Sequence, residues 1–272
     1  MTSAPTDPDP KLEPGLEALE HGRINRAVSN PELWPRIEFL VDSTNTRLAE
    51  LRATGEAVRV LLAEAQQAGR GRRGRHWLSP PGRGLYLSMA WCFARPPRQM
   101  AALALVAGLA AADSIAEQSA VKVGLKWPND LQISGRKLGG CLIDLHAAGA
   151  GASAAIIGIG INIDFRGLDG PDQAWTDLLE HEPKLSRNAL ASALINALDR
   201  DLSLFDRKGF ACFASRWAAR DALAGRDIIL SDPNGTRAEG RACGVDALGN
   251  LIVETAQGTR LIAVGEVSLR TL

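Results

Sequence analysis

The feature that most constrains this chain is the segment Gly69–Arg75, in which four arginines are interspersed with three glycines. Glycine raises the entropic cost of ordering a backbone, and unpaired arginines cannot be buried, so the segment predicts neither a helix nor a packed strand. Glycine N–H groups can approach phosphate oxygens closely, and each guanidinium group can donate paired hydrogen bonds to a phosphate or carboxylate. We therefore expect a mobile loop that binds an anion, such as a nucleotide or a nucleic acid.

Two other interpretations of this segment remain open from the residues alone. Arg/Gly tracts also bind RNA, and many stay solvated without any ligand. The chain has 31 basic and 31 acidic residues, a balance that disfavours duplex DNA or an anionic membrane surface as the main partner. The arginine segment therefore predicts a local anion site within an otherwise neutral protein.

Two later segments, Lys126–Asp130 and Arg136–Gly140, place further charged residues where strands end or begin. Residues 121–127 predict a strand that the following proline terminates, so Asn129 and Asp130 project at its end. A carboxylate beside an arginine loop is a candidate Mg²⁺ ligand, because proteins usually hold this ion with one or two carboxylates and with phosphate oxygens. An Asx-turn after the proline is the alternative for Asp130.

The remaining patterns predict a mixed α+β domain. Glycines in Ile157–Asn162 superficially resemble a phosphate loop, but the alternating β-branched residues favour a strand in which Gly158 and Gly160 leave room for a ligand. Ser43 and Thr44 precede a predicted helix, so helix capping is the structural alternative to ligand binding for both. The other expected strands are 37–40, 57–65, 84–93, 141–145 and 154–163, and the expected helices are 43–53, 99–118, 186–204 and 210–219.

The length of the chain and the change in its residue pattern near Gly225 predict one large domain followed by a small one. The chain has 272 residues, of which 46% are hydrophobic, and this suffices for a sizeable core. From Gly225 onward, short β-runs alternate with turn residues, which predicts a small barrel. We assign 1–33 to a disordered or weakly helical N-terminal extension, 34–222 to the large domain and 223–272 to the small domain.

The four cysteines are scattered, without a CxxC pair or a Cys/His cluster, and predict reduced, mostly buried thiols and no zinc site. The N-terminus lacks a basic-then-apolar leader, and the apolar run at 101–112 is too short to span a bilayer. A cytoplasmic location is the default expectation.

Four segments together closely resemble the motifs of biotin protein ligases: Glu64–Trp77, Gly84–Ser88, Lys126–Asp130 and Lys137–Gly140. Their order and spacing match from about Val41 onward, and Gly265–Arg270 is similar to the end of the SH3-like C-terminal domain of these ligases. The resemblance implies an α+β, mixed-sheet catalytic domain of the biotin/lipoate ligase (class II synthetase-like) type, followed by an SH3-like small β-barrel. It also implies ATP-dependent attachment of biotin to a specific lysine of a biotin carboxyl carrier protein through biotinyl-5′-AMP.

The resemblance further implies roles for individual residues. For biotin binding it points to Ser43, Thr44, Gln66, Arg70, Trp77, Gly84, Tyr86, Lys137, Gly139, Gly158 and Gly160. For ATP binding it points to Arg70, Arg72, Arg75, Asn129, Asn162 and Trp175. Lys137, Arg72 and Asp130 are expected to be catalytic, with Asp130 also the metal ligand. A plain core position for Trp77 and a loop anchor for Trp175 are the structural alternatives.

The implied mechanism needs charge stabilisation and exclusion of water, and no covalent nucleophile. Lys137 is expected to bridge the biotin carboxylate and the α-phosphate, while arginines of the loop hold the surrounding oxygens. Trp77 is expected to order over biotin when the loop closes.

Biotin and ATP are the expected substrates, Mg²⁺ the cofactor, and the carrier protein of acetyl-CoA carboxylase or of a similar biotin enzyme the partner. The segment before Leu33 is too short for the winged-helix repressor domain that some biotin ligases carry, so we expect a monofunctional enzyme with no nucleic-acid partner. We also expect no membrane partner, and a monomer or weak homodimer. A lipoate ligase and an Arg/Gly RNA-binding module are the alternatives, the latter distinguished by salt-dependent RNA binding without ATP turnover.

Overall fold

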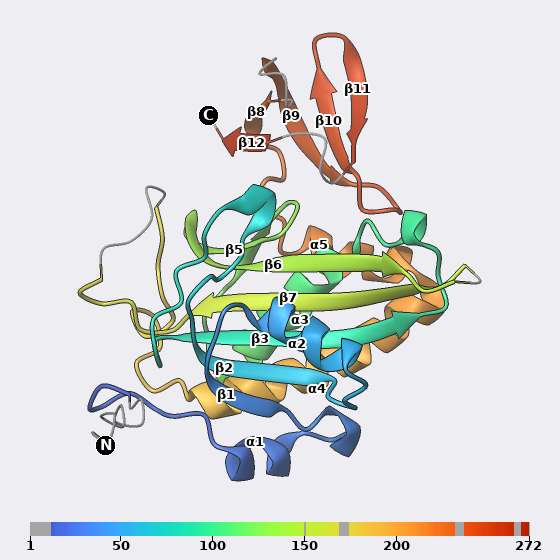
Figure 1. Ribbon diagram of the computed structural model, residues 1–272. Coiled ribbons are helices and arrows are strands. Elements are labelled where there is room, and N and C mark those ends of the chain that lie inside the picture. The colour runs from blue at the N-terminus through green and yellow to red at the C-terminus, as the bar shows by residue number, and fades with distance from the viewer. Residues whose placement is uncertain (1–11, 150, 169–173, 232–236, 264–267, 272) are drawn as a thin grey trace, which may run out of the picture.

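Two β-sheets organise the molecule, and the computed structural model describes residues 12–149, 151–168, 174–231, 237–263 and 268–271 (Figure 1). The larger sheet has the strand order β1-β2-β3-β7-β6-β5-β4, with β1 parallel to β2 and the other pairs antiparallel. Its strands are β1 (Arg36–Val41), β2 (Val60–Gln66), β3 (Gly84–Phe93), β4 (Gly124–Lys126), β5 (Asp130–Ile133), β6 (Arg136–Ala147) and β7 (Ser153–Asn162). The predicted mixed sheet of the α+β catalytic domain is confirmed.

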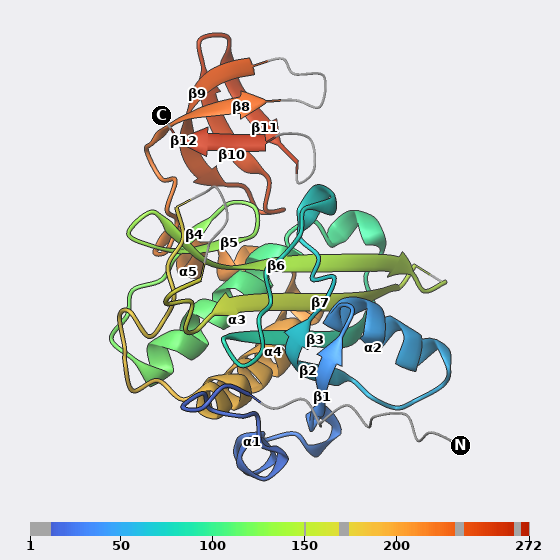
Figure 2. The ribbon, with the colours of Figure 1, turned by 60° about the vertical axis from the view of Figure 1, so that its left-hand side comes forward.

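Helices cover both faces of this sheet (Figures 1 and 2). The buried helices α3 (Leu103–Gln118) and α4 (Arg187–Lys208) pack together on one face and enclose the main hydrophobic core. The shorter α2 (Thr44–Ala53) lies on the other face, where Leu48 and Leu51 pack on β2 and β7 residues. Two small helices complete the domain, α1 (His21–Ala27) and α5 (Ala214–Ala218).

Side-chain alternation along β7 separates the core from the opposite face. Ile157, Ile159 and Ile161 are buried in the main core, as period-two alternation requires. The intervening Gly158 and Gly160 therefore face the α2 side, and with no side chain they leave space above the sheet. The strand interpretation of 157–162 is confirmed.

Several predicted elements differ from the observed ones at their ends. The strand predicted at 121–127 shrinks to Gly124–Lys126, and the helix predicted from Gln99 begins at Leu103 after a 3-10 turn. Ser134-Gly135 predicts a short hairpin turn, and the structure has this turn between β5 and β6, with positive φ at both Ser134 (50°) and Gly135 (79°). These adjustments leave the predicted order of elements unchanged.

Residues 12–33 pack on the large domain, so the disorder predicted for part of this extension is wrong there, whereas the short helix α1 agrees with the weakly helical alternative. Ile24 and Leu33 are fully buried in the main core. Glu17 accepts hydrogen bonds from the backbone N–H of Arg187 and from Ser186, where α4 begins. The acidic side chain thus stabilises the N-terminus of a helix that is far away in sequence. Residues 1–11, where disorder was also predicted, lie outside the described part of the chain.

The C-terminal domain is an antiparallel five-stranded sheet of order β11-β10-β9-β8-β12, which sits above the large domain in Figure 1. It comprises β8 (Asp227–Ser231), β9 (Arg237–Val245), β10 (Leu251–Thr255), β11 (Gly258–Ile262) and β12 (Ser268–Thr271). Among the described residues β11 and β12 are the edges of this sheet, so no barrel closure joins them. Residues 264–267 of the predicted closing motif and the turn predicted at Asn234-Gly235 lie outside the described residues.

One hydrogen bond joins the two domains at the edge of the larger sheet. Trp127, buried after β4, donates from Nε1 to the carbonyl oxygen of Gly249, at 3.0 Å. A Cβ on Gly249 would lie 2.6 Å from that of Ala102, and its φ of 85° also favours glycine. The contact therefore depends on a residue without a side chain.

The cysteine prediction is wrong in one respect. All four thiols are free, but Cys92, Cys212 and Cys243 are exposed and only Cys141 is buried. An apolar neighbourhood in sequence does not decide which face of a strand or helix a residue takes. No helix among the described residues is long and apolar enough to cross a bilayer.

Candidate active site

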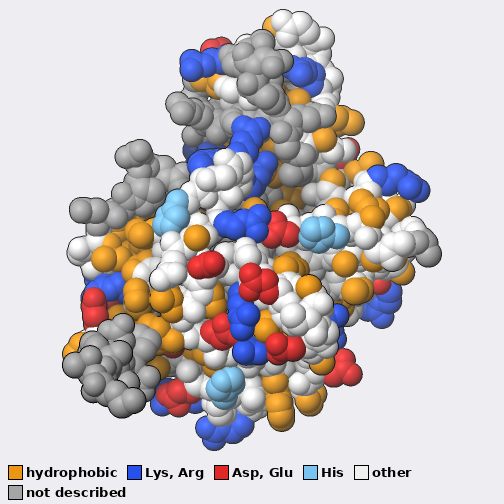
Figure 3. Space-filling view, viewed as in Figure 1, with side chains coloured by type: hydrophobic (Ala, Val, Ile, Leu, Met, Phe, Trp, Pro, Cys, Tyr) orange, Lys and Arg blue, Asp and Glu red, His pale blue; other side chains and the backbone are white. Residues whose placement is uncertain are grey.

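A cavity of about 880 Å³ opens on the α2 side of the large sheet, beneath the arginine loop and next to the C-terminal domain. Figure 3 shows Lys and Arg side chains gathered where the two domains meet on this face. The cavity brings together most of the predicted site: Ser43, Thr44, Gln66, Arg70, Arg72, Arg75, Trp77, Asn129, Asp130, Lys137, Gly158, Gly160, Asn162 and Trp175. Segments that are distant in sequence thus converge on one site.

The arginine loop forms a short hairpin in this structure. Gly71 N–H donates to the carbonyl oxygen of Arg75 at 2.7 Å, and Trp77 N–H donates to Gly69 at 2.8 Å. Arg73 occupies the left-handed region at the turn, with φ of 58°. A Cβ on Gly69 would lie 2.4 Å from the Trp77 carbonyl oxygen, so this position requires glycine. The glycines therefore allow the loop to fold back on itself, in addition to any role toward phosphate.

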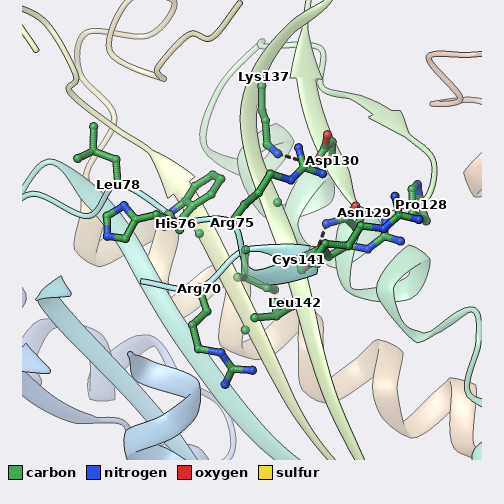
Figure 4. Close-up of a pocket in the computed structure, with 18 of the residues that line it drawn as sticks. Arg70, Arg75, His76, Leu78, Pro128, Asn129, Asp130, Lys137, Cys141 and Leu142 are labelled. Atoms are coloured by element: carbon green, nitrogen blue, oxygen red, sulfur yellow. Dashed lines mark hydrogen bonds and ion pairs between the residues drawn. The ribbon is translucent and has the colours of Figure 1, made fainter. Parts of the chain in front are cut away.

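Lys137 and Asp130 meet in the cavity, and Figure 4 shows the two side chains pointing toward one another. Their Nζ and Oδ1 atoms are 2.7 Å apart, and the Lys137 ammonium lies 5.5 Å from the centre of the Trp77 ring. Asp130 begins β5 opposite Gly140, so the β5–β6 pairing places carboxylate and ammonium side by side. The ion pair is the structural role observed for Asp130, rather than the Asx-turn considered from sequence.

Several basic side chains surround the carboxylate of Asp130 in the cavity. Arg72 donates to Asn129 Oδ1 at 3.0 Å, and burial together with the neighbouring Arg73 and Arg75 lowers its pKa, an effect that Asp130 partly offsets. Burial also lowers the pKa of Lys126, and the Lys137 charge acts in the same direction. An arriving phosphate would favour the charged form of each group. The site is therefore prepared to bind an anion.

Cys141 is the one cysteine at the cavity, and it is an unsuitable nucleophile. Burial, followed by the nearby Asp130 charge, raises the pKa of its thiol to about 12. The thiol therefore stays protonated at neutral pH, whereas a reactive cysteine needs the thiolate.

A polar cluster occupies the other end of the cavity. Gln66 Oε1 accepts from the Thr44 N–H at 2.8 Å and from its hydroxyl at 3.1 Å. Gln66 Nε2 donates to Ser79 at 2.7 Å. Ser43 is the N-cap residue of α2, but its side chain makes no capping bond. The capping alternative therefore does not account for Ser43, and the start of α2 faces the cavity.

Gly158 and Gly160 are required by protein contacts as well as by any ligand. A Cβ on Gly158 would lie 2.3 Å from Asn45 Oδ1, and one on Gly160 would lie 2.6 Å from Trp77 Nε1. Trp77 thus lies directly on the sheet, and its buried Nε1 has no hydrogen-bond partner among the described residues. The aromatic ring is part of the cavity wall, which distinguishes it from a plain core tryptophan.

Three predicted residues, Gly84, Tyr86 and Gly139, do not line the cavity. Tyr86 is 1% exposed and donates its hydroxyl to Pro80, in the segment that follows the loop. A Cβ on Gly84 would lie 2.5 Å from the Tyr86 ring, and one on Gly139 would lie 2.6 Å from the neighbouring strand. The prediction that these three residues line the cavity is therefore wrong for this structure.

Asn162 and Trp175 lie together at the nucleotide end proposed from sequence. Asn162 donates to the Thr176 carbonyl oxygen at 3.0 Å, and Lys137 pairs through its backbone with the same segment. Trp175 meets Phe165 edge-on, with ring centres 5.7 Å apart. Trp175 therefore anchors its segment and also lines the cavity, so both sequence interpretations fit the geometry.

Several residues of this site were given no individual role from the sequence. The cavity also contains Asn45, His76, Lys126, Trp127, Gly140 and Leu142, together with Ile229, Ser231 and Arg237 from the C-terminal domain. Asn45 had a signal, because it follows the predicted Ser-Thr pair directly. The C-terminal residues had none, since nothing in a short β-run indicates which other domain it faces.

The residues around Asp130 fit a metal ion only if the substrate brings most of the ligands. Within the described ranges, no three His, Cys, Asp or Glu side chains gather as an all-protein metal site. Mg²⁺ is often held by one or two carboxylates and otherwise by phosphate and water oxygens. A single carboxylate beside the arginine loop is consistent with that arrangement.

Family models match both domains. Residues 37–162 match the biotin/lipoate A/B protein ligase family, and residues 224–270 match the biotin protein ligase C terminal domain. The bifunctional ligase/repressor BirA of Escherichia coli is 39% identical over 240 residues, which cover 85% of this chain and 73% of the relative.

Two further relatives match over almost their whole length. The biotin–[acetyl-CoA-carboxylase] ligase of Mycobacterium tuberculosis is 30% identical over 271 residues, 96% of this chain and 98% of the relative. The biotin protein ligase of Aquifex aeolicus, solved with biotin and ATP, superposes with a TM-score of 0.74 at 30% identity, covering 88% of this chain and 99% of that one. Sequence and fold thus point to the same group of proteins.

Proposed function

The chain belongs to the biotin protein ligase family, and from this premise we propose which residues carry each step of the reaction. The protein attaches biotin to a carrier protein in an ATP-dependent reaction through biotinyl-5′-AMP. A biotin carboxylate oxygen attacks the α-phosphorus of ATP, and pyrophosphate leaves. The ε-amine of a carrier lysine then attacks the acyl carbon, loses a proton and displaces AMP.

Lys137 is the proposed electrostatic catalyst of both steps. Its ammonium lies inside the cavity between the Asp130 carboxylate and the Trp77 ring, and this is the observation that carries the proposal. Two anions, the biotin carboxylate and the α-phosphate, must approach each other in the first step. A preorganised cation at their meeting point lowers the cost of that approach.

Arg72, Arg75 and Lys126 are proposed to bind the phosphate oxygens of ATP. Arg72 is held by Asn129, which itself donates to the Cys141 carbonyl oxygen at 2.8 Å, so the guanidinium group is fixed before ATP arrives. Fixed donors need no reorganisation during the reaction. Asp130 would share a Mg²⁺ ion with the phosphates; when bound, this ion neutralises phosphate charge.

The proposed biotin end is the polar cluster at the start of α2. Thr44, Asn45 and Gln66 offer donors and acceptors beside Gly158, which suits a small ureido group with both N–H and C=O. Trp77 supplies an apolar wall above Gly160, and closure of the loop would keep water from the anhydride. The protein partner is proposed to be the biotin carboxyl carrier protein of acetyl-CoA carboxylase or of a similar enzyme.

Exchange of labelled pyrophosphate into ATP tests this proposal. The purified chain should catalyse exchange only with biotin present, and should then transfer biotin to one lysine of an added carrier protein. Exchange that depends on lipoate and not on biotin would instead support the alternative ligase activity.

A further inference from the structure

The two ends of the arginine loop are tied to one polar network that passes through residues at the start of α2. At the first end, Arg70 donates to Asp144 through both terminal nitrogens, at 3.1 and 3.2 Å. At the second end, the carbonyl oxygen of Trp77 accepts from Ser79 at 3.1 Å. Neither Asp144 nor Ser79 belongs to the loop.

The middle of the network connects these two ends through the proposed biotin-binding residues. Asn45 Nδ2 donates to Asp144 at 3.0 Å, and Asn45 Oδ1 lies 2.6 Å from Ser88 Oγ. Ser88 Oγ also lies 2.8 Å from the Thr44 hydroxyl, so its single hydrogen can serve either neighbour. Thr44 then donates to Gln66, and Gln66 donates to Ser79.

Arg70 faces Asp144 rather than the phosphate end of the cavity. Figure 4 shows the Arg70 side chain directed away from Lys137 and Asp130. Its paired donors match the two oxygens of one carboxylate, a geometry that fixes orientation as well as distance. This differs from the sequence prediction, in which Arg70 contacts the phosphate or carboxylate of the ligand.

We propose that Asp144 is a positioning residue that holds the arginine loop closed through Arg70, and that Asn45 links this contact to the bound biotin headgroup. The inference rests on the proposed function of the cavity. Biotin that binds beside Asn45 would orient the side-chain amide of Asn45 and so favour the Asp144–Arg70 contact. Ligand binding at one end of the cavity would in this way stabilise the closed loop at the other.

Limited trypsin digestion of the purified chain tests the proposal without any ligand. Asp144→Asn keeps the shape of the side chain and its acceptor for Asn45, but loses the charge that pairs with Arg70. Because the Arg70 and Asp144 side chains are 48% and 23% exposed, we expect a modest effect, with cleavage at Arg72–Arg75 about fivefold faster than in the wild type. Asp144→Glu, which retains a carboxylate, should restore most of the protection.

Two controls separate positioning from general destabilisation. Glu38 pairs with Arg47 at 3.0 Å with similar exposure but lies outside the network, so Glu38→Gln should leave loop cleavage unchanged. Arg70→Gln should accelerate cleavage as Asp144→Asn does, and the double variant should be no faster, because the two residues act through one contact. The melting temperature of each variant is measured in parallel.

Adenylate retention gives the second readout. After loading with biotin and ATP, Asp144→Asn should lose bound biotinyl-5′-AMP about fivefold faster than the wild type. In Asn45→Ala, biotin alone should no longer slow trypsin cleavage.

Wild-type rates of loop cleavage in Asp144→Asn would overturn the inference, as would equal acceleration in Asp144→Glu or in Glu38→Gln. Failure of the wild type to catalyse biotin-dependent exchange would instead overturn the proposed function. The digestion of free protein remains informative in that case, so the two failures are distinguishable.

Discussion

The ammonium group of Lys137 lies 2.7 Å from the carboxylate of Asp130, although six residues separate them along the chain. The hairpin between β5 and β6 brings them together, and the Trp77 ring covers the pair from the loop side. Only 16% of the Lys137 side chain is exposed. The cation is therefore oriented before any substrate binds.

Replacing Lys137 should remove this oriented cation without unfolding the protein. We expect Lys137→Ala to lower biotin-dependent ATP–pyrophosphate exchange by at least ~10²-fold, the scale for losing one preorganised electrostatic group. Circular dichroism should be unchanged. Lys122→Ala, at an exposed position outside the cavity, is the control. An exchange rate equal to that of the wild type would exclude Lys137 from the mechanism.

Lys126 should make nucleotide affinity depend on pH in the alkaline range. Burial lowers its pKa below the ordinary value of 10.5, so it loses its proton at a lower pH than a free lysine does. Because phosphate favours the protonated form, ATP affinity should fall as pH rises through this lowered pKa. Titration calorimetry between about pH 7 and 10 measures the profile. Lys126→Arg, which stays protonated, should flatten it, and an unchanged profile would contradict this role.

Adding one methyl group to the cavity floor should prevent the loop from closing. In Gly160→Ala the new Cβ would lie 2.6 Å from Trp77 Nε1, so the ring must move away. We expect bound biotinyl-5′-AMP to dissociate at least ~10-fold faster, as a filter-binding chase can measure, since misplacing a positioning group is costly. Gly22→Ala, which meets nothing within 4 Å, should behave like the wild type. Equal dissociation rates in both variants would show that Trp77 is not part of the closed site.

Arg72→Gly should weaken the binding of biotinyl-5′-AMP by the arginine loop, so that the adenylate dissociates before it is transferred. The change removes the hydrogen bond to Asn129 and one of the cations grouped around Asp130. Released anhydride acylates nearby amines, so bystander lysines should become biotinylated, as detected by mass spectrometry of a mixture with an unrelated protein. Arg98→Gly, an exposed arginine outside the cavity, is the matched control. Adenylate retention equal to that of the wild type would refute the loop as a lid.

The buried Glu64–Arg187 pair should matter for stability more than any surface pair. Glu64 Oε2 lies 2.9 Å from Arg187, and the two side chains are 6% and 1% exposed. Glu64→Gln leaves Arg187 without its ionic partner, and we expect the free energy of unfolding in urea to fall by about 3 kcal/mol. Glu56→Gln breaks an exposed pair with Arg36 and should cost less than about 1 kcal/mol. Similar losses in the two variants would contradict this ranking.

Much of the site was predictable because its charged residues sit in short local patterns. The arginine loop, Asp130 after the proline and Lys137 after the hairpin turn all lie where the sequence places them, at strand ends around one cavity. Because turn-forming residues act locally, the hairpin turn at Ser134-Gly135 could be predicted without any long-range information.

The residues that escaped prediction act through partners far away in sequence. Asp144 lies within an alternating strand, and only the fold brings it to Arg70 and Asn45. Glu17 lies in the extension that was expected to be disordered or weakly helical, yet it binds the start of α4, 170 residues away. Interactions of this kind depend on the packing of complete elements, which no local pattern encodes.

The contact between Trp127 and Gly249 couples the positions of two segments that are 122 residues apart. Trp127 belongs to the segment that leads to Asn129 and Asp130, so its anchor in the C-terminal domain helps to set where this part of the cavity lining begins. A chimaera that takes its C-terminal domain from another ligase must retain a small residue with positive φ at 249, facing an indole donor at 127. Substitutions at these two positions should therefore be accepted in pairs during evolution, and domain exchange that ignores the pairing should yield a folded but misaligned enzyme.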